Sequence, residues 1–254
     1  MPIENIQEIT AFPLSRLFAL WLASGLAIVV ISLIYAKAAA IPSEFLNHNE
    51  VIRLIQGAVL LLAGFWAMTT LGVTAGSLSS RLAAGINDSV KLAFKYFLIY
   101  GLAVMVIVAA LSLTAMLLMK LGVFSMDALD GYHARAAAEK LAQKNYLREV
   151  LFASPLKLLV YLFATCVLIP IEEEIFTRRL LYVSLRRKIG FYSALIIASI
   201  VFGLEHLGGA AVPAVIFGGY LTWIYEKHRD LAANIMVHGL INFSVILVMM
   251  FFSV

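Results

Sequence analysis

Charged residues are scarce in this chain of 254 residues: Lys, Arg, Asp and Glu together make up only 13% of it. A soluble domain of this size carries about 25% charged residues, whereas here 63% of the residues are hydrophobic and stand in long runs. This composition argues against an ordinary soluble domain and indicates a polytopic membrane protein. Because no basic globular segment accompanies the net charge of +4, we expect contact with anionic lipid headgroups and no binding of nucleic acid.

Cysteine is almost absent, since Cys166 is the only one. No disulfide can form within the chain and no cysteine cluster can hold a metal. Cys166 stands seven residues before Glu173, so the two share a helix face and a thiol mechanism is conceivable. A single small cysteine in a membrane helix usually serves packing, however, and this is the favoured interpretation. The chain also lacks the motif HExxH, which in many zinc proteases places two zinc-binding histidines on one helix face.

The hydrophobic runs predict an all-α fold, a polytopic transmembrane bundle of about seven spans, possibly eight. The first run follows Glu4 and Glu8 and is too long for a signal peptide, so we expect an uncleaved first span. Pro170 predicts a kink in the fourth span. The predicted spans cover residues 17–36, 54–74, 96–119, 156–185, 190–207, 210–225 and 231–253.

A polar region, residues 126–155, separates the third span from the fourth. Its composition favours a helix on the membrane surface, with a solvated helical linker as the alternative. The chain then divides into N-terminal transmembrane helices (1–125), this polar region, and a transmembrane core (156–254). Basic residues of the short loops gather on the side of the N-terminus, which predicts a cytoplasmic N-terminus. The compactness of the chain favours the inner membrane of a prokaryote.

A cluster of three glutamates and two arginines interrupts the fourth span between Glu172 and Arg179. Ionisable groups at membrane depth are rare and usually functional. Glu174 and Arg178 are four residues apart and are expected to pair on one helix face. Glu173 points about 100° away and stays available for chemistry. The alternative is that the whole segment caps a shorter span at the membrane interface.

The fifth span ends with a histidine, His206, one turn after Phe202. A histidine at a helix end is most often a hydrogen-bonded interfacial residue. Its neighbour Glu205 is expected to point away from it, toward a headgroup or a polar loop.

The last span carries a polar stripe at every fourth residue: Asn234, His238 and Asn242. Its simplest role is hydrogen bonding between helices. At about 1.5 Å per residue, His206, His238 and Asn242 can reach the depth of Glu173. An acid, two histidines and an amide in a cavity of low dielectric constant suit water activation and oxyanion stabilisation.

The order of these residues resembles a known family. Glu173-Glu174-x-x-x-Arg178, Phe202-x-x-x-His206 and His238-x-x-x-Asn242 are similar to the EExxxR, FxxxH and HxxxN/D motifs of the CPBP family. This is the CaaX-protease and bacteriocin-processing (Abi) family of glutamic-type intramembrane endopeptidases. The resemblance covers residue 156 to the C-terminus. Arg179 stands where many members have glycine, which alters packing or adds a charge facing the substrate.

The resemblance implies an intramembrane endopeptidase that cuts near the end of a membrane-bound or lipidated peptide or protein and needs no cofactor. Its implied catalytic residues are Glu173 and His206 for water activation, His238 and Asn242 for the oxyanion, and Glu174 with Arg178 as a supporting ion pair.

Other functions remain open on sequence grounds. Glutamate and histidines are also respectable zinc ligands, so a zinc-dependent membrane protease is one alternative. Buried Glu and His chains also serve proton relays, so a proton-linked transporter or a non-catalytic membrane scaffold is another. Nothing in the sequence separates prenylated termini from leader or signalling peptides as substrate.

Overall fold

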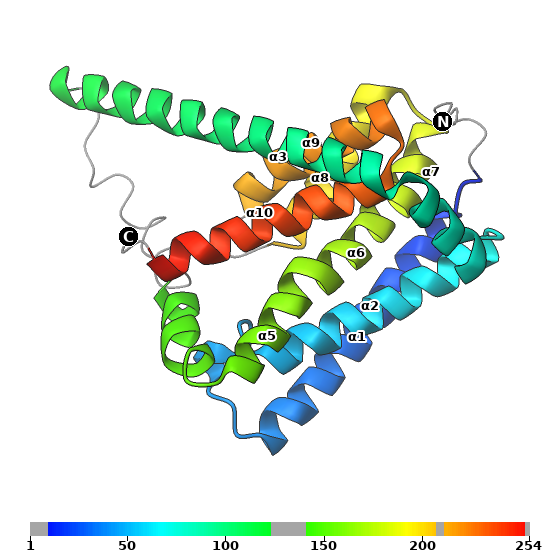
Figure 1. Ribbon diagram of the computed structural model, residues 1–254, viewed down its shortest axis with the longest axis horizontal. Coiled ribbons are helices and arrows are strands. Elements are labelled where there is room, and N and C mark those ends of the chain that lie inside the picture. Colours follow the sequence, from blue (N-terminus) through cyan, green and yellow to red (C-terminus); the bar gives the residue numbers. More distant parts are fainter. Residues whose placement is uncertain (1–9, 123–140, 207–210, 252–254) are drawn as a thin grey trace.

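The computed structural model describes residues 10–122, 141–206 and 211–251. The regular elements of these segments are all helices (Figure 1). Five of the helical segments are long and apolar enough to cross a membrane, namely Leu14–Ala38, Glu50–Thr70, Gly85–Lys120, Pro155–Arg186 and Leu231–Phe251. The predicted all-α membrane fold is therefore confirmed.

The first two helices, α1 (Leu14–Ala38) and α2 (Glu50–Thr70), lie side by side and are joined through the short helix η1 (Ser43–Phe45) (Figure 1). The side chain of Asn49 accepts hydrogen bonds from the first backbone N–H groups of α2, which fixes where that helix begins. Both helices coincide with predicted spans. α2 also packs along the fourth span, so it forms one wall of the region that contains the glutamates.

The third helix, α3 (Ala75–Lys120), has 46 residues and is much longer than the predicted span 96–119. At about 1.5 Å per residue it is more than twice as long as the roughly 30 Å hydrocarbon core. Figure 1 shows its C-terminal part running past the rest of the bundle. Hydropathy detects only the apolar part of such a helix, so the predicted span left out Lys91 and Lys95, which are helical.

The fourth span is one continuous helical segment in which α-helical and π-helical turns alternate. Pro170 has no N–H to donate to the carbonyl of Cys166, four residues earlier, which favours a wider turn at this point. The kink expected at Pro170 stays a prediction. The segment consists of α5 (Pro155–Phe163), η4 (Ala164–Leu168), α6 (Ile169–Glu174), η5 (Ile175–Tyr182) and α7 (Val183–Arg186).

Two shorter helices, α8 (Phe191–Leu204) and α9 (Ala211–His228), pack closely against each other. They coincide with the predicted spans 190–207 and 210–225. With 14 residues, α8 extends about 21 Å, too short to cross a bilayer alone. The number of membrane crossings therefore stays a prediction. The last helix, α10 (Leu231–Phe251), packs against α3, α6 and η4.

Of the predicted polar region 126–155, residues 126–140 lie outside the described residues. The part that follows is helical and includes η3 (Tyr146–Leu151). Tyr146, Leu147 and Leu151 are buried in a cluster with Tyr161 and Ile246. The described end of this region therefore packs into the bundle.

Candidate active site

The centre of the site is a fully buried ion pair on the fourth span. Arg178 Nε lies 3.1 Å from Glu174 Oε2, and neither side chain is exposed. Arg178 also donates to the carbonyl oxygen of Gly218 on α9, and its guanidinium lies 4.8 Å from the ring centroid of Phe202 on α8. The expected pairing of residues four apart is present, and the arginine ties α6 to both short helices. The segment is therefore buried against its neighbouring helices, and its depth in the membrane stays a prediction.

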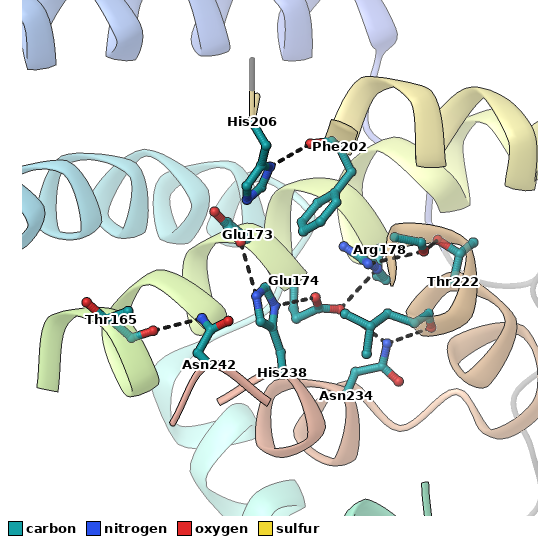
Figure 2. Close-up of polar contacts among 12 residues, drawn as sticks. Thr165, Glu173, Glu174, Arg178, Phe202, His206, Thr222, Asn234, His238 and Asn242 are labelled. Atoms are coloured by element: carbon teal, nitrogen blue, oxygen red, sulfur yellow. Dashed lines mark hydrogen bonds and ion pairs between the residues drawn. The ribbon is translucent and has the colours of Figure 1, made fainter. Parts of the chain in front are cut away.

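His238 on α10 lies between the two neighbouring glutamates (Figure 2). Its Nδ1 is 3.0 Å from Glu174 Oε1, and its Nε2 is 3.4 Å from Glu173 Oε2. A carboxylate can only accept, so the proton on Nδ1 points at Glu174. This hydrogen bond holds Glu174, whose charge is compensated by Arg178, whereas Glu173 makes only the longer contact.

Asn234, one turn before His238 on α10, also contacts Glu174. Its amide nitrogen donates to Glu174 Oε2 at 3.2 Å and to the carbonyl oxygen of Leu221 at 2.8 Å. The predicted polar stripe of the last span thus has the interhelical hydrogen bonds that its spacing indicates. Glu174 accordingly receives contacts from Arg178, His238 and Asn234, which makes it a structural acceptor.

The close approach of α10 to the fourth span depends on Gly239. A Cβ atom at this position would stand 2.3 Å from the carbonyl oxygen of Cys166. Real Cβ atoms do not come so near, so only glycine allows this packing distance. Gly239 follows His238 directly, and the contact therefore sets how far the imidazole reaches toward Glu173 and Glu174.

His206 approaches Glu173 from the end of α8. Its Nδ1 is 2.9 Å from the carbonyl oxygen of Phe202, and the two rings lie 4.8 Å apart. A carbonyl only accepts, so Nδ1 carries the hydrogen and Nε2 of a neutral ring is free to accept a proton. Figure 2 shows this side of the ring pointing toward the Glu173 carboxylate.

One cavity of about 450 Å³ brings the predicted catalytic residues together, because Glu173, His206, His238 and Asn242 all line it. They come from α6, from the turn after α8, and from α10. The amide nitrogen of Asn242 donates to the carbonyl oxygen of Thr165 at 2.9 Å, which leaves its second hydrogen available. The supporting residues Glu174 and Arg178 lie behind the cavity wall.

Several residues of this cavity were missed by sequence reasoning. Glu205 was expected to point away from His206, but both line the cavity. The expectation was wrong because Glu205 lies beside α1, where its carboxylate accepts a hydrogen bond from Trp21. Trp21 of α1 and Arg53 of α2 also line the cavity. Neither belongs to a local motif, so no sequence signal pointed to them.

Arg179, the departure from the family pattern, serves packing. Its guanidinium donates to the carbonyl oxygen of Thr10 at 3.1 Å, and it is absent from the cavity lining. Nearby, Ser184 donates to the carbonyl oxygen of Phe12. These bonds fasten the segment before α1 to the C-terminal part of the fourth span.

A structural or catalytic metal ion needs at least three protein ligands that converge on one point. Within residues 10–122, 141–206 and 211–251, no three His, Cys, Asp or Glu side chains are placed to hold an ion together. Cys166 does not line the cavity and is half-buried.

Comparisons with known proteins identify one family. Residues 155–244 match the family model described as Rce1-like, type II CAAX prenyl endopeptidase. The comparisons with curated proteins and with solved structures gave no match. The matched segment begins with α5 and contains every residue of the three motifs. The match covers about a third of the chain, and it makes this segment similar to the CAAX-type membrane endopeptidases of the CPBP family.

Proposed function

We propose that this protein is a glutamic-type intramembrane endopeptidase in which Glu173 and His206 activate a water molecule. The observation that carries the proposal is the shared cavity of Glu173, His206, His238 and Asn242 beside a buried ion pair. The printed name of the matching family adds the expected substrate class, a membrane-bound protein with a prenylated C-terminal peptide.

Glu173 and Glu174 have different roles in this proposal. Glu174 is occupied by Arg178, His238 and Asn234, so it positions groups and takes no proton from water. Glu173 keeps an oxygen that has no hydrogen bond among the described residues, apart from the 3.4 Å contact with His238. A carboxylate that lines a cavity with one weakly engaged oxygen is suited to act as a general base.

In the proposed reaction, water lies between Glu173 and His206. Glu173 takes one proton while the water oxygen forms a bond to the carbonyl carbon of the scissile peptide bond. The remaining N–H of Asn242, and His238 when its Nε2 carries a proton, donate to the oxyanion. The C–N bond then breaks, and the proton held by Glu173 passes to the leaving amine.

The mechanism can be tested with purified protein in liposomes and a membrane-anchored peptide that bears a prenylated cysteine near its C-terminus. New termini are followed by mass spectrometry. Glu173→Gln and His206→Gln should each lower kcat by about 10²–10⁴-fold, the usual contribution of a general base. Lys91→Gln on α3 is the matched control, because Lys91 is exposed and lies outside the cavity.

Full turnover by Glu173→Gln would contradict the proposed base. The role of metal is tested separately, by dialysis against a strong chelator before the assay. Undiminished cleavage is the expected result, whereas a loss that zinc alone restores would favour a metalloprotease. In cells, comparison of the termini of membrane proteins with wild-type or Glu173→Gln enzyme would then identify the natural substrate.

A further inference from the structure

Two glutamates that belong to none of the three motifs line the same cavity as the catalytic candidates. Glu172 directly precedes Glu173, and Glu205 directly precedes His206. Each extra carboxylate therefore stands beside one of the two residues that are proposed to activate water. A substrate whose scissile bond reaches Glu173 and His206 must also pass near these two carboxylates.

Glu172 is buried and has no ion-pair partner in the part of the chain that the structure describes. It is 2% exposed, and its Oε1 has no hydrogen bond among the described residues. Glu173 and Glu205 lie near enough for their negative charges to repel that of Glu172. A buried carboxylate without compensation is costly, and unpartnered polar atoms of this kind are unusual in native proteins. A bound ligand can therefore supply the hydrogen-bond donor that Glu172 Oε1 lacks.

Glu205 occupies a more open position in the cavity lining. Its side chain is exposed, and its Oε1 accepts a hydrogen bond of 2.9 Å from the indole N–H of Trp21. Trp21 also lines the cavity and is itself 42% exposed. An aromatic face beside a carboxylate is favourable for a long basic side chain, whose stem is apolar and whose head is charged.

The charge of Arg178 attracts that of Glu205, but the two described arginines near these carboxylates are engaged with other partners. Arg178 is engaged with Glu174 and is absent from the cavity lining. Arg53 lines the cavity, but its guanidinium lies over Tyr161, which packs with Ile246. Ile246 is two turns beyond His238 on α10, about 12 Å along the helix. Glu172 and Glu205 thus lie at the end of the cavity that contains Glu173 and His206. The guanidinium of Arg53 lies toward the other end, near Ile246.

We propose that Glu172 and Glu205 form a subsite for a basic side chain, Lys or Arg, of the peptide substrate next to the scissile bond. The inference rests on the proposed endopeptidase function and adds a charge preference to it. At membrane depth the attraction is strengthened by the low dielectric constant. An acidic side chain at the same place is repelled, so the subsite discriminates in both directions.

The test uses membrane-anchored, prenylated peptides in which a single Lys, Gln or Glu is moved through each position around the scissile bond. Wild-type protein in liposomes should cleave the best Lys peptide with a kcat/KM about tenfold or more above that of the matching Gln peptide. The Glu peptide should be the poorest. In Glu172→Gln/Glu205→Gln the ratio of Lys to Gln should fall to about one. Asp88→Asn, which removes an exposed carboxylate of α3 outside the cavity, should keep the wild-type ratio.

Equal cleavage of Lys and Gln peptides at every position by the wild type would overturn the subsite, as would a preference that survives in the double variant. Absence of any cleavage would count against the endopeptidase function. The subsite is then decided by binding of the same peptides to Glu173→Gln, followed by fluorescence anisotropy. Tighter binding of the Lys peptide, lost on adding Glu172→Gln and Glu205→Gln, supports the subsite, and equal binding overturns it.

Discussion

Arg178 and Glu174 form a salt bridge of 3.1 Å in which neither side chain has any exposed surface. Removing one partner of such a pair leaves a buried charge without compensation, whereas removing both leaves only a change in packing. The pair therefore stabilises the arrangement of α6, α8 and α9 only as long as both members are present. The site depends on it because His238 is held by the same carboxylate.

We predict that Arg178→Met destabilises the folded protein by about 3–5 kcal/mol, and that Glu174→Gln/Arg178→Met is the more stable of the two variants. The measurement is the thermal midpoint of each variant in detergent micelles. The exposed pair of Asp88 and Lys91 is the control, since loss of Asp88 should change stability by less than about 1 kcal/mol. A double variant less stable than Arg178→Met would refute this account.

Much of this site was predictable because helix periodicity acts over short distances in sequence. The interval of four residues indicated the pairing of Glu174 with Arg178, and the stripe of the last span indicated a face directed at protein. Spacing could not say which partner each residue of the stripe takes. In the structure Asn234 and His238 form hydrogen bonds with Glu174, whereas Asn242 donates to the carbonyl oxygen of Thr165.

What periodicity could not supply comes from contacts between distant segments. Trp21 donates a hydrogen bond to Glu205, 184 residues later in the sequence, and no local pattern around either residue indicates this contact. The position of Glu205 in the cavity lining depends on this long-range contact. The predicted span 96–119 was shorter than α3 for another reason. Hydropathy marks the apolar part of a helix and not its full length.

The contact of Gly239 with the fourth span gives a second prediction. Gly239→Ala places a methyl group against the carbonyl oxygen of Cys166, so α10 must move away and His238 with it. If His238 has its proposed role, we expect kcat to fall by about 10²-fold, because small displacements of a catalytic group are costly. Gly101→Ala on α3 is the matched control, because a Cβ there meets no atom within 4 Å. Equal kcat values for the two variants would show that this approach is unimportant.

A third prediction separates catalysis from stability at Glu174. His238 and Asn234 both contact this carboxylate, but only His238 lines the cavity. Asn234→Leu and His238→Gln should each lower the free energy of unfolding by about 1–3 kcal/mol, the cost of a lost buried hydrogen bond. Only His238→Gln should also lower kcat by about 10²–10³-fold at saturating substrate. Similar losses of kcat in both variants would indicate that His238 acts through Glu174 alone.

A fourth prediction concerns acid, and it rests on His48, which lies between α1 and α2. Burial, with a smaller contribution from Arg53, lowers the pKa of His48 from its ordinary value of 6.5 to about 4. Between these values the unfolded chain binds a proton that the folded chain does not, so acidification destabilises the fold. At pH 5 the loss is at most about 2 kcal/mol. The thermal midpoint of the wild type should therefore fall between pH 7 and pH 5 by more than that of His48→Gln, which has no titrating ring. An equal fall in both proteins would assign the acid sensitivity to other groups.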